Sequence, residues 1–395
     1  MKIDILIKNG HIVDPARGID AVGEIAVCGG KIVDLQGEIP EPAQTIDADG
    51  CYVFPGLIDY HTHIFYGGTA LGACPDFMLS TGVTAAVDAG SAGSYTFPVF
   101  QKNVIANSNV RIKAFVSCYP MGLGGERVQE NFDPKFFDES NLRHLFNTEK
   151  DAILGLKMRI SRGLIRDLEP LRAAVALAER LGNDVPLCVH ITDPAGSMDE
   201  VMELMRPGDI VCHVYEGTGN TILDENNSVL PSVRAARDRG VIFDVANGKM
   251  NFSVEVCQRA MEQGFLPDVI STDMSVEKIH YGARVRTLPF VMSKFLSLGM
   301  SLTEVIRRTT EIPAALMGLQ GEIGTLRPGS RADICICKLV EREVMHYDTN
   351  RVAFRGRHLL IPQMTVVDGK IAFGQIDFSL PEEDIENLFA GKRIK

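Results

Sequence analysis

The sequence predicts an α/β protein, a (β/α)8 barrel of the TIM type with a small β-sandwich domain built from both termini. Three observations lead to this fold class. The middle of the chain alternates apolar β-like runs with amphipathic helices, whereas both ends contain short strands separated by turn residues. Polar residues also recur at the carboxyl ends of the middle strands, where barrels carry their reactive groups.

The two ends of the chain have similar patterns. Ile3–Leu6 is followed by Asn9-Gly10, and Gly29-Gly30 separates two further apolar runs, so both pairs predict hairpins. After about residue 325, Asp368-Gly369 lies between Gln363–Val367 and Lys370–Phe373 in the same way. We therefore predict a composite β-sandwich from residues 1–52 and 325–395, with the barrel between them at 53–324.

The barrel prediction depends on eight strand candidates and the helices between them. The clearest helix is Leu168–Leu181, whose apolar residues follow helical spacing. The eight candidate strands are Val53–Asp59, Thr84–Ala89, Ile112–Ser117, Ile153–Ile160, Leu187–Ile191, Ile210–Tyr215, Ile242–Val245 and Val269–Asp273.

Composition restricts the class of protein. The chain has 395 residues, 45% of them hydrophobic, and a net charge of -11, which argues against nucleic acid or an anionic membrane as a main partner. The N-terminal residues form a charged strand pattern, and no apolar stretch has the length of a membrane helix. The nine cysteines include no CxxC pair and favour buried reduced thiols in a cytoplasmic protein.

The sequence Asp59-Tyr-His-Thr-His63 places two histidines on one face of a strand, because side chains at i and i+2 point the same way. A lone His-x-His pair is weak evidence for a metal site. Each further candidate also has a structural explanation, such as a hydrogen-bonded core histidine or a helix-capping aspartate. The metal interpretation depends on the whole series at or near successive strand ends: His61, His63, Lys157, His190, His213 and Asp273.

This series resembles the amidohydrolase superfamily. The segments Phe54-Pro-Gly-Leu-Ile-Asp-Tyr-His-Thr-His63 and Gly324-Thr-Leu-Arg-Pro-Gly-Ser-Arg-Ala-Asp333 are similar to that family's boundary motifs. Val87-Asp-Ala-Gly-Ser-Ala-Gly93 and Gly155-Leu-Lys-Met-Arg159 indicate its dihydroorotase-like or deacetylase-like branch. The resemblance covers essentially the whole chain.

The resemblance implies two divalent metal ions, zinc in first place with manganese or iron as alternatives. His61, His63 and Asp273 would hold one ion, and His190 and His213 the other. Lys157 would bridge the ions as a carbamate formed with carbon dioxide, and the two cations would select its neutral amine. A metal-bridging hydroxide would attack the scissile carbonyl, with Asp273 transferring the proton to the leaving group.

Residues that differ from those usual in dihydroorotases narrow the class of substrate. Dihydroorotases usually carry a substrate-binding arginine two residues after the His-x-His, where this chain has Phe65. Arg159 shares a face with Lys157 and is our first candidate for gripping a substrate carboxylate, with a structural ion pair as the alternative. Weaker candidates for substrate binding are Asn247, Gly248, Tyr95 and His280.

These residues favour hydrolysis of an amide or ester bond, with an N-acyl amino acid or an O-acetyl hydroxy acid as substrate. A deaminase or a cyclic amidase acting on a nucleobase-like ring, of the dihydroorotase or hydantoinase kind, remains an alternative. A non-catalytic scaffold is disfavoured because the whole ligand series is present. We also expect a homo-oligomer.

Overall fold

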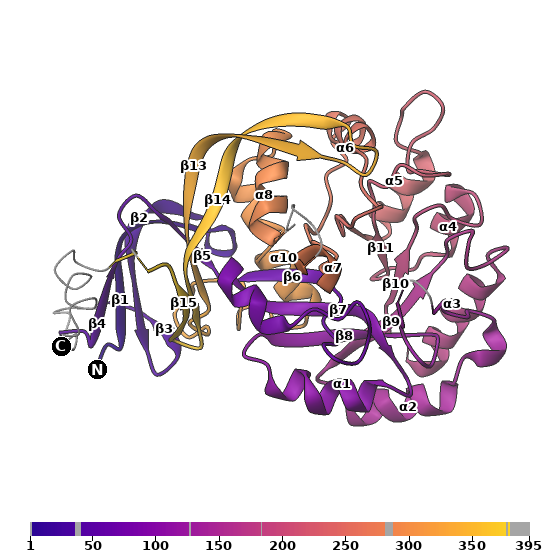
Figure 1. Ribbon diagram of the computed structural model, residues 1–395, viewed down its shortest axis with the longest axis horizontal. Helices are drawn as coiled ribbons and strands as arrows, with labels where there is room; N and C mark the ends of the chain where they lie inside the picture. The colour runs from indigo at the N-terminus through magenta and orange to yellow at the C-terminus, as the bar shows by residue number, and fades with distance from the viewer. Residues whose placement is uncertain are drawn as a thin grey trace.

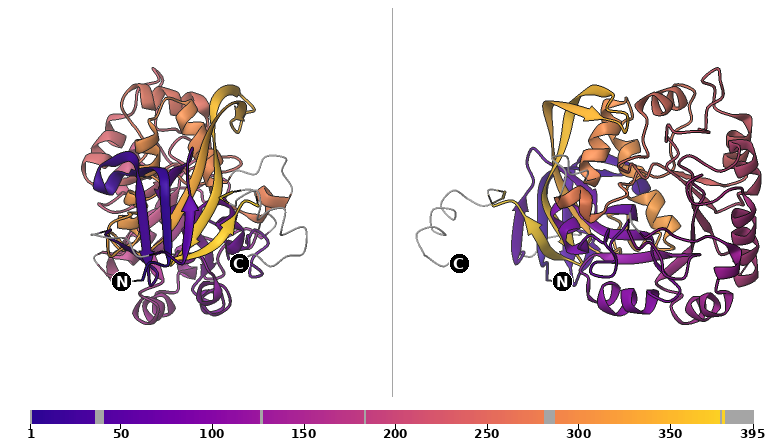
Figure 2. Two further views of the ribbon diagram at one scale, coloured as in Figure 1. Left: turned by 90° about the vertical axis from the view of Figure 1, so that its left-hand side faces the viewer. Right: turned by 45° about the vertical axis from the view of Figure 1, so that its right-hand side comes forward.

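The computed structural model describes residues 2–35, 41–125, 128–182, 184–280, 287–376 and 378–379, apart from the side chains of Lys278 and His280. It contains a barrel and an outer β-sheet that lie side by side (Figures 1 and 2). Among the described residues, no helix combines the length and apolar character needed to cross a bilayer.

The barrel is a curled parallel sheet in which sequential strands are neighbours. Its strands are β6 (Leu57–Thr62), β7 (Val83–Gly93), β8 (Arg111–Ser117), β9 (Ile153–Arg159), β10 (Leu187–His190), β11 (Ile210–Cys212) and β12 (Ile242–Asp244). These elements confirm the predicted α/β barrel class.

The predicted eighth strand, Val269–Asp273, is not a regular strand in the described structure. It closes the barrel through isolated parallel bridges, Asp244 to Val269 on one side and Thr62 to Met274 on the other. The Asp59 carboxylate accepts hydrogen bonds from the backbone N–H and the hydroxyl of Thr272, at 3.0 and 2.6 Å. Because a side chain takes this amide, the segment cannot form a continuous ladder with its neighbours.

Helices pack on the outside of the curled sheet (Figure 1). The predicted helix at 168–181 is confirmed as α3 (Glu169–Leu181). The others are α1 (Phe97–Asn103), α2 (Glu139–Thr148), α4 (Met198–Leu204), α5 (Pro231–Asp238), α6 (Val254–Glu262), α7 (Val276–His280), α8 (Leu288–Ser297), α9 (Leu302–Arg307) and α10 (Glu311–Leu316).

The outer sheet is mixed and takes strands from both ends of the chain. Its order is β15-β14-β13-β5-β1-β2-β3, and β4 pairs in parallel with β1. The strands are β1 (Ile5–Asp14), β2 (Ile19–Cys28), β3 (Lys31–Val33), β4 (Gln44–Asp47), β5 (Tyr52–Pro55), β13 (Ile334–Tyr347), β14 (Ala353–Val367) and β15 (Lys370–Gly374). The division of the chain into domains at residues 52 and 325 remains a proposal.

Two details of the outer sheet differ from the prediction. Asn9-Gly10 does not turn the chain; it lies inside continuous β1, at an irregularity in the pairing with β2, and Asn9 has φ 64°. The predicted strand Val53–Asp59 is split, since β5 pairs with β1 and β13 whereas β6 opens the barrel. Gly29-Gly30 and Asp368-Gly369 do form the predicted hairpin turns, each with two positive φ angles.

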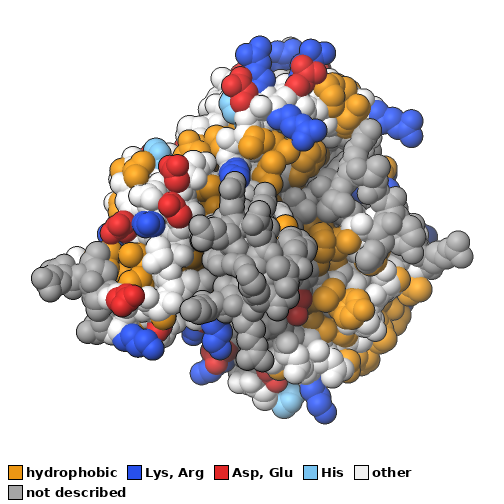
Figure 3. Space-filling view, turned by 60° about the vertical axis from the view of Figure 1, so that its left-hand side comes forward, with side chains coloured by type: hydrophobic (Ala, Val, Ile, Leu, Met, Phe, Trp, Pro, Cys, Tyr) orange, Lys and Arg blue, Asp and Glu red, His pale blue; other side chains and the backbone are white. Residues whose placement is uncertain are grey.

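β13 and β14 form one long hairpin that extends over α8 (Figure 1). On the face of the molecule drawn in Figure 3, acidic and basic side chains are interspersed with hydrophobic ones. The barrel interior is filled by side chains that include Tyr60, Phe115, Cys188 and Cys212. This packed core closes the bottom of the barrel and leaves the carboxyl ends of the strands open for a site.

Candidate metal centre and active site

Side chains at the carboxyl ends of the barrel strands surround a cavity of about 460 Å³. His213 is buried at the end of β11 and packs behind the cavity wall, with its ring centroid 4.3 Å from that of His190. The other members of the predicted ligand series line the cavity itself: His61, His63, Lys157, His190 and Asp273.

Five members of the predicted ligand series lie close together. The Oδ1 atom of Asp273 lies 3.2 Å from His63 Nε2 and 4.0 Å from His61 Nε2. The Nζ atom of Lys157 lies 3.4 Å from His61 Nε2, and the His61 and His213 ring centroids are 5.3 Å apart. Nitrogen and oxygen atoms from strands far apart in the sequence therefore meet at one place.

The imidazole rings are oriented by hydrogen bonds at Nδ1. His61 Nδ1 lies 3.1 Å from a carboxylate oxygen of Asp244, and His63 Nδ1 lies 3.0 Å from the hydroxyl of Ser91. His213 Nδ1 lies 2.7 Å from the backbone oxygen of Ala246. Ligating histidines in metal sites are held in this way, and the Nε2 atoms are left for a cation.

Burial controls the charge of these groups. It lowers the pKa of the His61 and His190 imidazoles well below their usual value, so both are neutral at pH 7, as metal ligands must be. Burial, the largest single effect, acts to lower the pKa of the Lys157 amine, but Cys188, Cys212 and Asp273 together outweigh it, so the pKa is raised. The neutral amine predicted from the sequence requires two cations beside Lys157. Without those cations, the protein groups favour the charged form of the amine.

The backbone is strained where two candidate ligands leave their strands. His213 and Asp273 have φ angles of 65° and 54°, in the left-handed region that non-glycine residues seldom adopt. Such conformations cost on the order of 1–3 kcal/mol each and persist where the surrounding structure enforces them, often at functional sites. At Gly90, a Cβ atom would lie 2.6 Å from the Lys157 side chain, so only glycine allows β7 to approach it.

Arg159 lines the cavity and is partly exposed. Its Nη1 atom donates to Oε2 of Glu130 at 2.6 Å, and the Glu130 side chain is only 2% exposed. Arg159 therefore faces the cavity and forms the ion pair of the structural alternative, whereas its contact with a substrate carboxylate remains a prediction. Asn251, which also lines the cavity, contacts the carboxylate of Asp273. Its Nδ2 lies 3.4 Å from Asp273 Oδ2, and its Oδ1 accepts a hydrogen bond from the hydroxyl of Thr192.

Among the described residues, the weaker substrate candidates Tyr95, Asn247 and Gly248 do not line the cavity. Tyr95 is 59% exposed and lines a separate hollow with Tyr119 and Lys135, so its predicted place at the substrate is not supported. Asn247 is fully buried and its Oδ1 accepts from Lys294 at 2.5 Å, so it points away from the cavity into the core. The side chain of His280 lies outside the described residues.

Gly248 does not line the cavity but forms part of the support of Asp273. It has φ 38°, and a Cβ atom there would lie 2.8 Å from Asp273 Oδ2 and still closer to Asn251. The backbone at Gly248 thus packs against the carboxylate, where a side chain would displace it.

Sequence reasoning missed the residues that support the candidate ligands. Asp244 is a charged residue inside the apolar run Ile242–Val245, and this was the sequence signal that could have indicated a functional role for it. Cys188 lies two residues before His190 and so shares its face, but we read it only as a buried thiol. Glu130, Asn251 and Ser91 come from loops or a strand end, and no sequence periodicity places them.

The donor set suits divalent cations. Imidazoles and a carboxylate close enough to meet at one cation are typical ligands of zinc and neighbouring transition metals. The group of His61, His63 and Asp273 has ligand atoms within 4.8 Å of one another. Lys157 is buried on β9, with its Nζ atom 3.4 Å from His61 Nε2, and its role as a bridge remains a prediction.

Residues 52–372 match the amidohydrolase family. The chain belongs to this family. As an amidohydrolase it is a hydrolytic enzyme of a family whose members generally bind divalent metals, which confirms the resemblance and the enzyme class predicted from the sequence.

Known relatives are similar over nearly the full length. A deacetylase of Agrobacterium fabrum is 32% identical over 375 residues, covering 93% of this amidohydrolase and 91% of the relative. A deacetylase of Brucella anthropi is 32% identical over 332 residues, covering 83% and 81%.

Solved structures show the same fold. The structure of an adenine deaminase matches with a TM-score of 0.85 at 27% identity, covering 94% of this chain and 100% of that one. A dihydroorotase matches with a TM-score of 0.83 at 31% identity, covering 94% and 98%.

Proposed function

We propose that this amidohydrolase removes the acyl group from an N-acyl amino acid or an O-acetyl hydroxy acid. The observation that carries the proposal is the cavity that joins the candidate metal ligands to Arg159, a cation suited to a substrate carboxylate. The named deacetylases at 32% identity support the same reaction class.

Residue 65, two positions after the His-x-His pair, also favours a deacylase over a dihydroorotase, because it is phenylalanine and not arginine. Phe65 is buried, and its ring packs 4.8 Å from the ring of Phe100 in the core. This position therefore faces helix α1 and not the cavity, so a substrate carboxylate must find its partner elsewhere. Arg159 is the arginine among the described residues that lines the cavity.

We propose two divalent ions as cofactors, with zinc preferred. His61, His63 and Asp273 would hold one ion, His190 and His213 the other, and Lys157 would join them as a carbamate. When bound, the ions would supply Lewis acidity and lower the pKa of a water molecule towards neutrality.

The protein's own groups have separate roles in the proposed reaction. Asp273 would take the proton of the attacking water and return it to the leaving amine or alkoxide. Asn251 holds Oδ2 of Asp273, so that Oδ1 faces His63. Arg159, fixed by Glu130, would grip the carboxylate and so orient the scissile bond.

A second candidate function is hydrolysis of a nucleobase-like ring, as a deaminase or a cyclic amidase. The named adenine deaminase and dihydroorotase structures favour it, because both cover nearly the whole chain. Both candidates use the same ligand set, so the difference lies in the groups that contact the substrate.

A substrate panel separates these candidates. We expect acetate release from N-acetyl amino acids or O-acetyl hydroxy acids, with preference for free carboxylates over their methyl esters. Ammonia release from aminopurines, or ring opening of a dihydropyrimidine or hydantoin, without acetate release from any acetylated acid, would reject the deacylase in favour of the ring hydrolase.

A further inference from the structure

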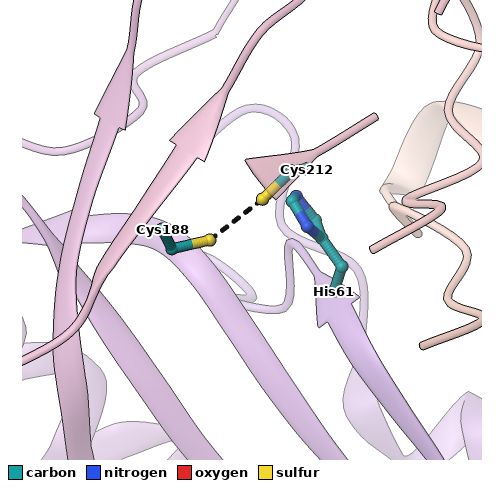
Figure 4. A group of neighbouring side chains, drawn as sticks. All are labelled: His61, Cys188 and Cys212. Carbon is teal, nitrogen blue, oxygen red and sulfur yellow. Dashed lines mark hydrogen bonds between the residues drawn. The ribbon is translucent and has the colours of Figure 1, made fainter. Parts of the chain in front are cut away.

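Two thiols lie beneath the floor of the cavity. Cys188 on β10 and Cys212 on the neighbouring β11 have their sulfur atoms 3.1 Å apart and pointing towards one another, and the ring of His61 lies beside Cys212 (Figure 4). The two cysteines are 2% and 0% exposed, and neither lines the cavity. The three ligand atoms of His61, Cys188 and Cys212 lie within 4.8 Å of one another.

The amino group of Lys157 lies over this triangle, out of the plane of its three atoms. Its Nζ atom lies 3.4 Å from His61 Nε2, 3.5 Å from Cys188 Sγ and 3.5 Å from Cys212 Sγ. Three potential ligands therefore already surround one cationic atom at nearly equal distances. A bound metal ion, with shorter bonds to the same three atoms, would lie closer to their plane than the ammonium does.

The triangle is rigid and chemically distinct from the site above it. Parallel pairing aligns His190 of β10 with Cys212 of β11, which fixes the two strands that carry the thiols. Asp244 holds Nδ1 of His61, so that Nε2 faces the sulfurs and Lys157. Two sulfur ligands and one imidazole select soft or borderline closed-shell ions such as Zn²⁺, Cd²⁺ and Hg²⁺, not Mn²⁺ or Mg²⁺.

We propose that Cys188, Cys212 and His61 form a binding site for one thiophilic divalent ion beneath the hydrolytic site. On binding, both thiols release their protons to solvent, two metal–sulfur bonds and one metal–nitrogen bond form, and the Lys157 amine leaves the triangle. The ion would bind Nε2 of His61, so His61 could no longer hold an ion of the proposed hydrolytic site. The lower site is therefore inhibitory and goes beyond the proposed function.

Cadmium is a suitable probe because thiolate ligation gives a charge-transfer absorption in the ultraviolet that oxygen and nitrogen ligands do not give. The full-length chain, treated with chelator and then freed of it, is titrated with Cd²⁺. We expect the absorption to saturate at about one equivalent. Cys188→Ser with Cys212→Ser should abolish it, whereas Cys118→Ser with Cys257→Ser, which changes two buried cysteines elsewhere, should preserve it.

Lys157→Met provides a test in which both thiols are intact. Removing the ammonium from the triangle should tighten thiolate-bound Cd²⁺ at least about tenfold, because the ion no longer competes with a fixed cation. The proposal is overturned if the unaltered chain gives no charge-transfer absorption. It is also overturned if the variant with both Cys188→Ser and Cys212→Ser keeps the absorption. A third contrary result would be Lys157→Met binding Cd²⁺ no more tightly than the unaltered chain.

These measurements need no substrate. Failure of the cadmium site would leave the deacylase proposal unaffected, and a failed substrate panel would leave the cadmium site unaffected.

Discussion

At the scale of single residues, the candidate site combines preorganised ligands with a cation for the substrate. Nδ1 of His61, His63 and His213 is held by a hydrogen bond, and His213 and Asp273 keep left-handed backbone angles. These ligand positions therefore need little rearrangement when a cation binds. Arg159 is held beside them by Glu130.

Arg159→Met should selectively impair acidic substrates. Losing a charge-assisted fork to the substrate carboxylate should lower kcat/KM by about 30- to 1,000-fold, or roughly 2–4 kcal/mol of transition-state binding. The comparison uses an acyl amino acid and its methyl ester, for which the loss should be small. Arg143→Met is the control, because Arg143 pairs with Glu139 on α2, outside the cavity lining. Equal losses on acid and ester would show that Arg159 supports the strand instead.

Lys157→Ala should remove most of the bound metal and activity, because the proposed bridge between the two ions is lost. Short carboxylic acids should restore part of the activity by filling the gap. Metal analysis and rates with and without added acid measure both effects. Lys113→Ala, on neighbouring β8, serves as the control. Full metal content and rate in Lys157→Ala would mean that the lysine has no bridging role.

At the scale of elements, the β13–β14 hairpin is bound to the barrel through α8. Its His346 is fully buried between the rings of Phe290 and Phe354, at centroid distances of 5.0 and 5.2 Å. Burial lowers the pKa of His346 to about 4, and the charge of Lys294 acts in the same direction. The hairpin thus buries a neutral histidine that the unfolded chain would protonate near pH 6.5.

This histidine should make the hairpin acid-sensitive. Between about pH 6.5 and pH 4 the unfolded state binds a proton that the folded state does not, so the free energy of unfolding falls as pH falls. We expect His346 to account for roughly 1–2 kcal/mol of that decrease by pH 5, allowing for partial screening. His346→Phe should remove this part of the slope in urea unfolding, whereas His358→Phe, at an exposed position of the same hairpin, should not. An unchanged slope in His346→Phe would contradict the prediction.

At the scale of the whole molecule, the proposed metal ions would connect parts of the barrel that are distant in sequence. The candidate ligands come from β6, β9, β10, the end of β11 and the irregular segment that closes the barrel before α7. Binding to these groups requires the closed barrel, so it should stabilise the folded state by mass action.

Metal removal should therefore lower the melting temperature. Protein purified without chelator should carry about two equivalents of divalent metal. At free ion concentrations of about 100 to 1,000 times Kd, binding contributes roughly 3–4 kcal/mol per site, which corresponds to several degrees in Tm. Calorimetry before and after chelation measures the shift, and His63→Ala should show a smaller one. One ion or none in active protein would reject the two-ion proposal.

The sequence by itself determined the barrel class, helix α3, the hairpin turns at Gly29-Gly30 and Asp368-Gly369, and the residues that could bind metal. These features depend on local periodicity, on turn residues and on family motifs, all of which are present along the chain. His61 and His63 could be placed on one face of a strand because side-chain direction there alternates with every residue.

Only the tertiary structure decided how those residues are supported and what lies beneath them. Asp244, Ser91, Glu130 and Asn251 reach the site across long separations, by hydrogen bonds that no local pattern encodes. Asn9-Gly10 resembles a turn, yet pairing with β2 keeps it inside a strand. Cys188 and Cys212 meet at Lys157 because neighbouring parallel strands curl around one interior. These contacts form only when the whole barrel packs, so the sequence shows which residues are present but not which of them touch.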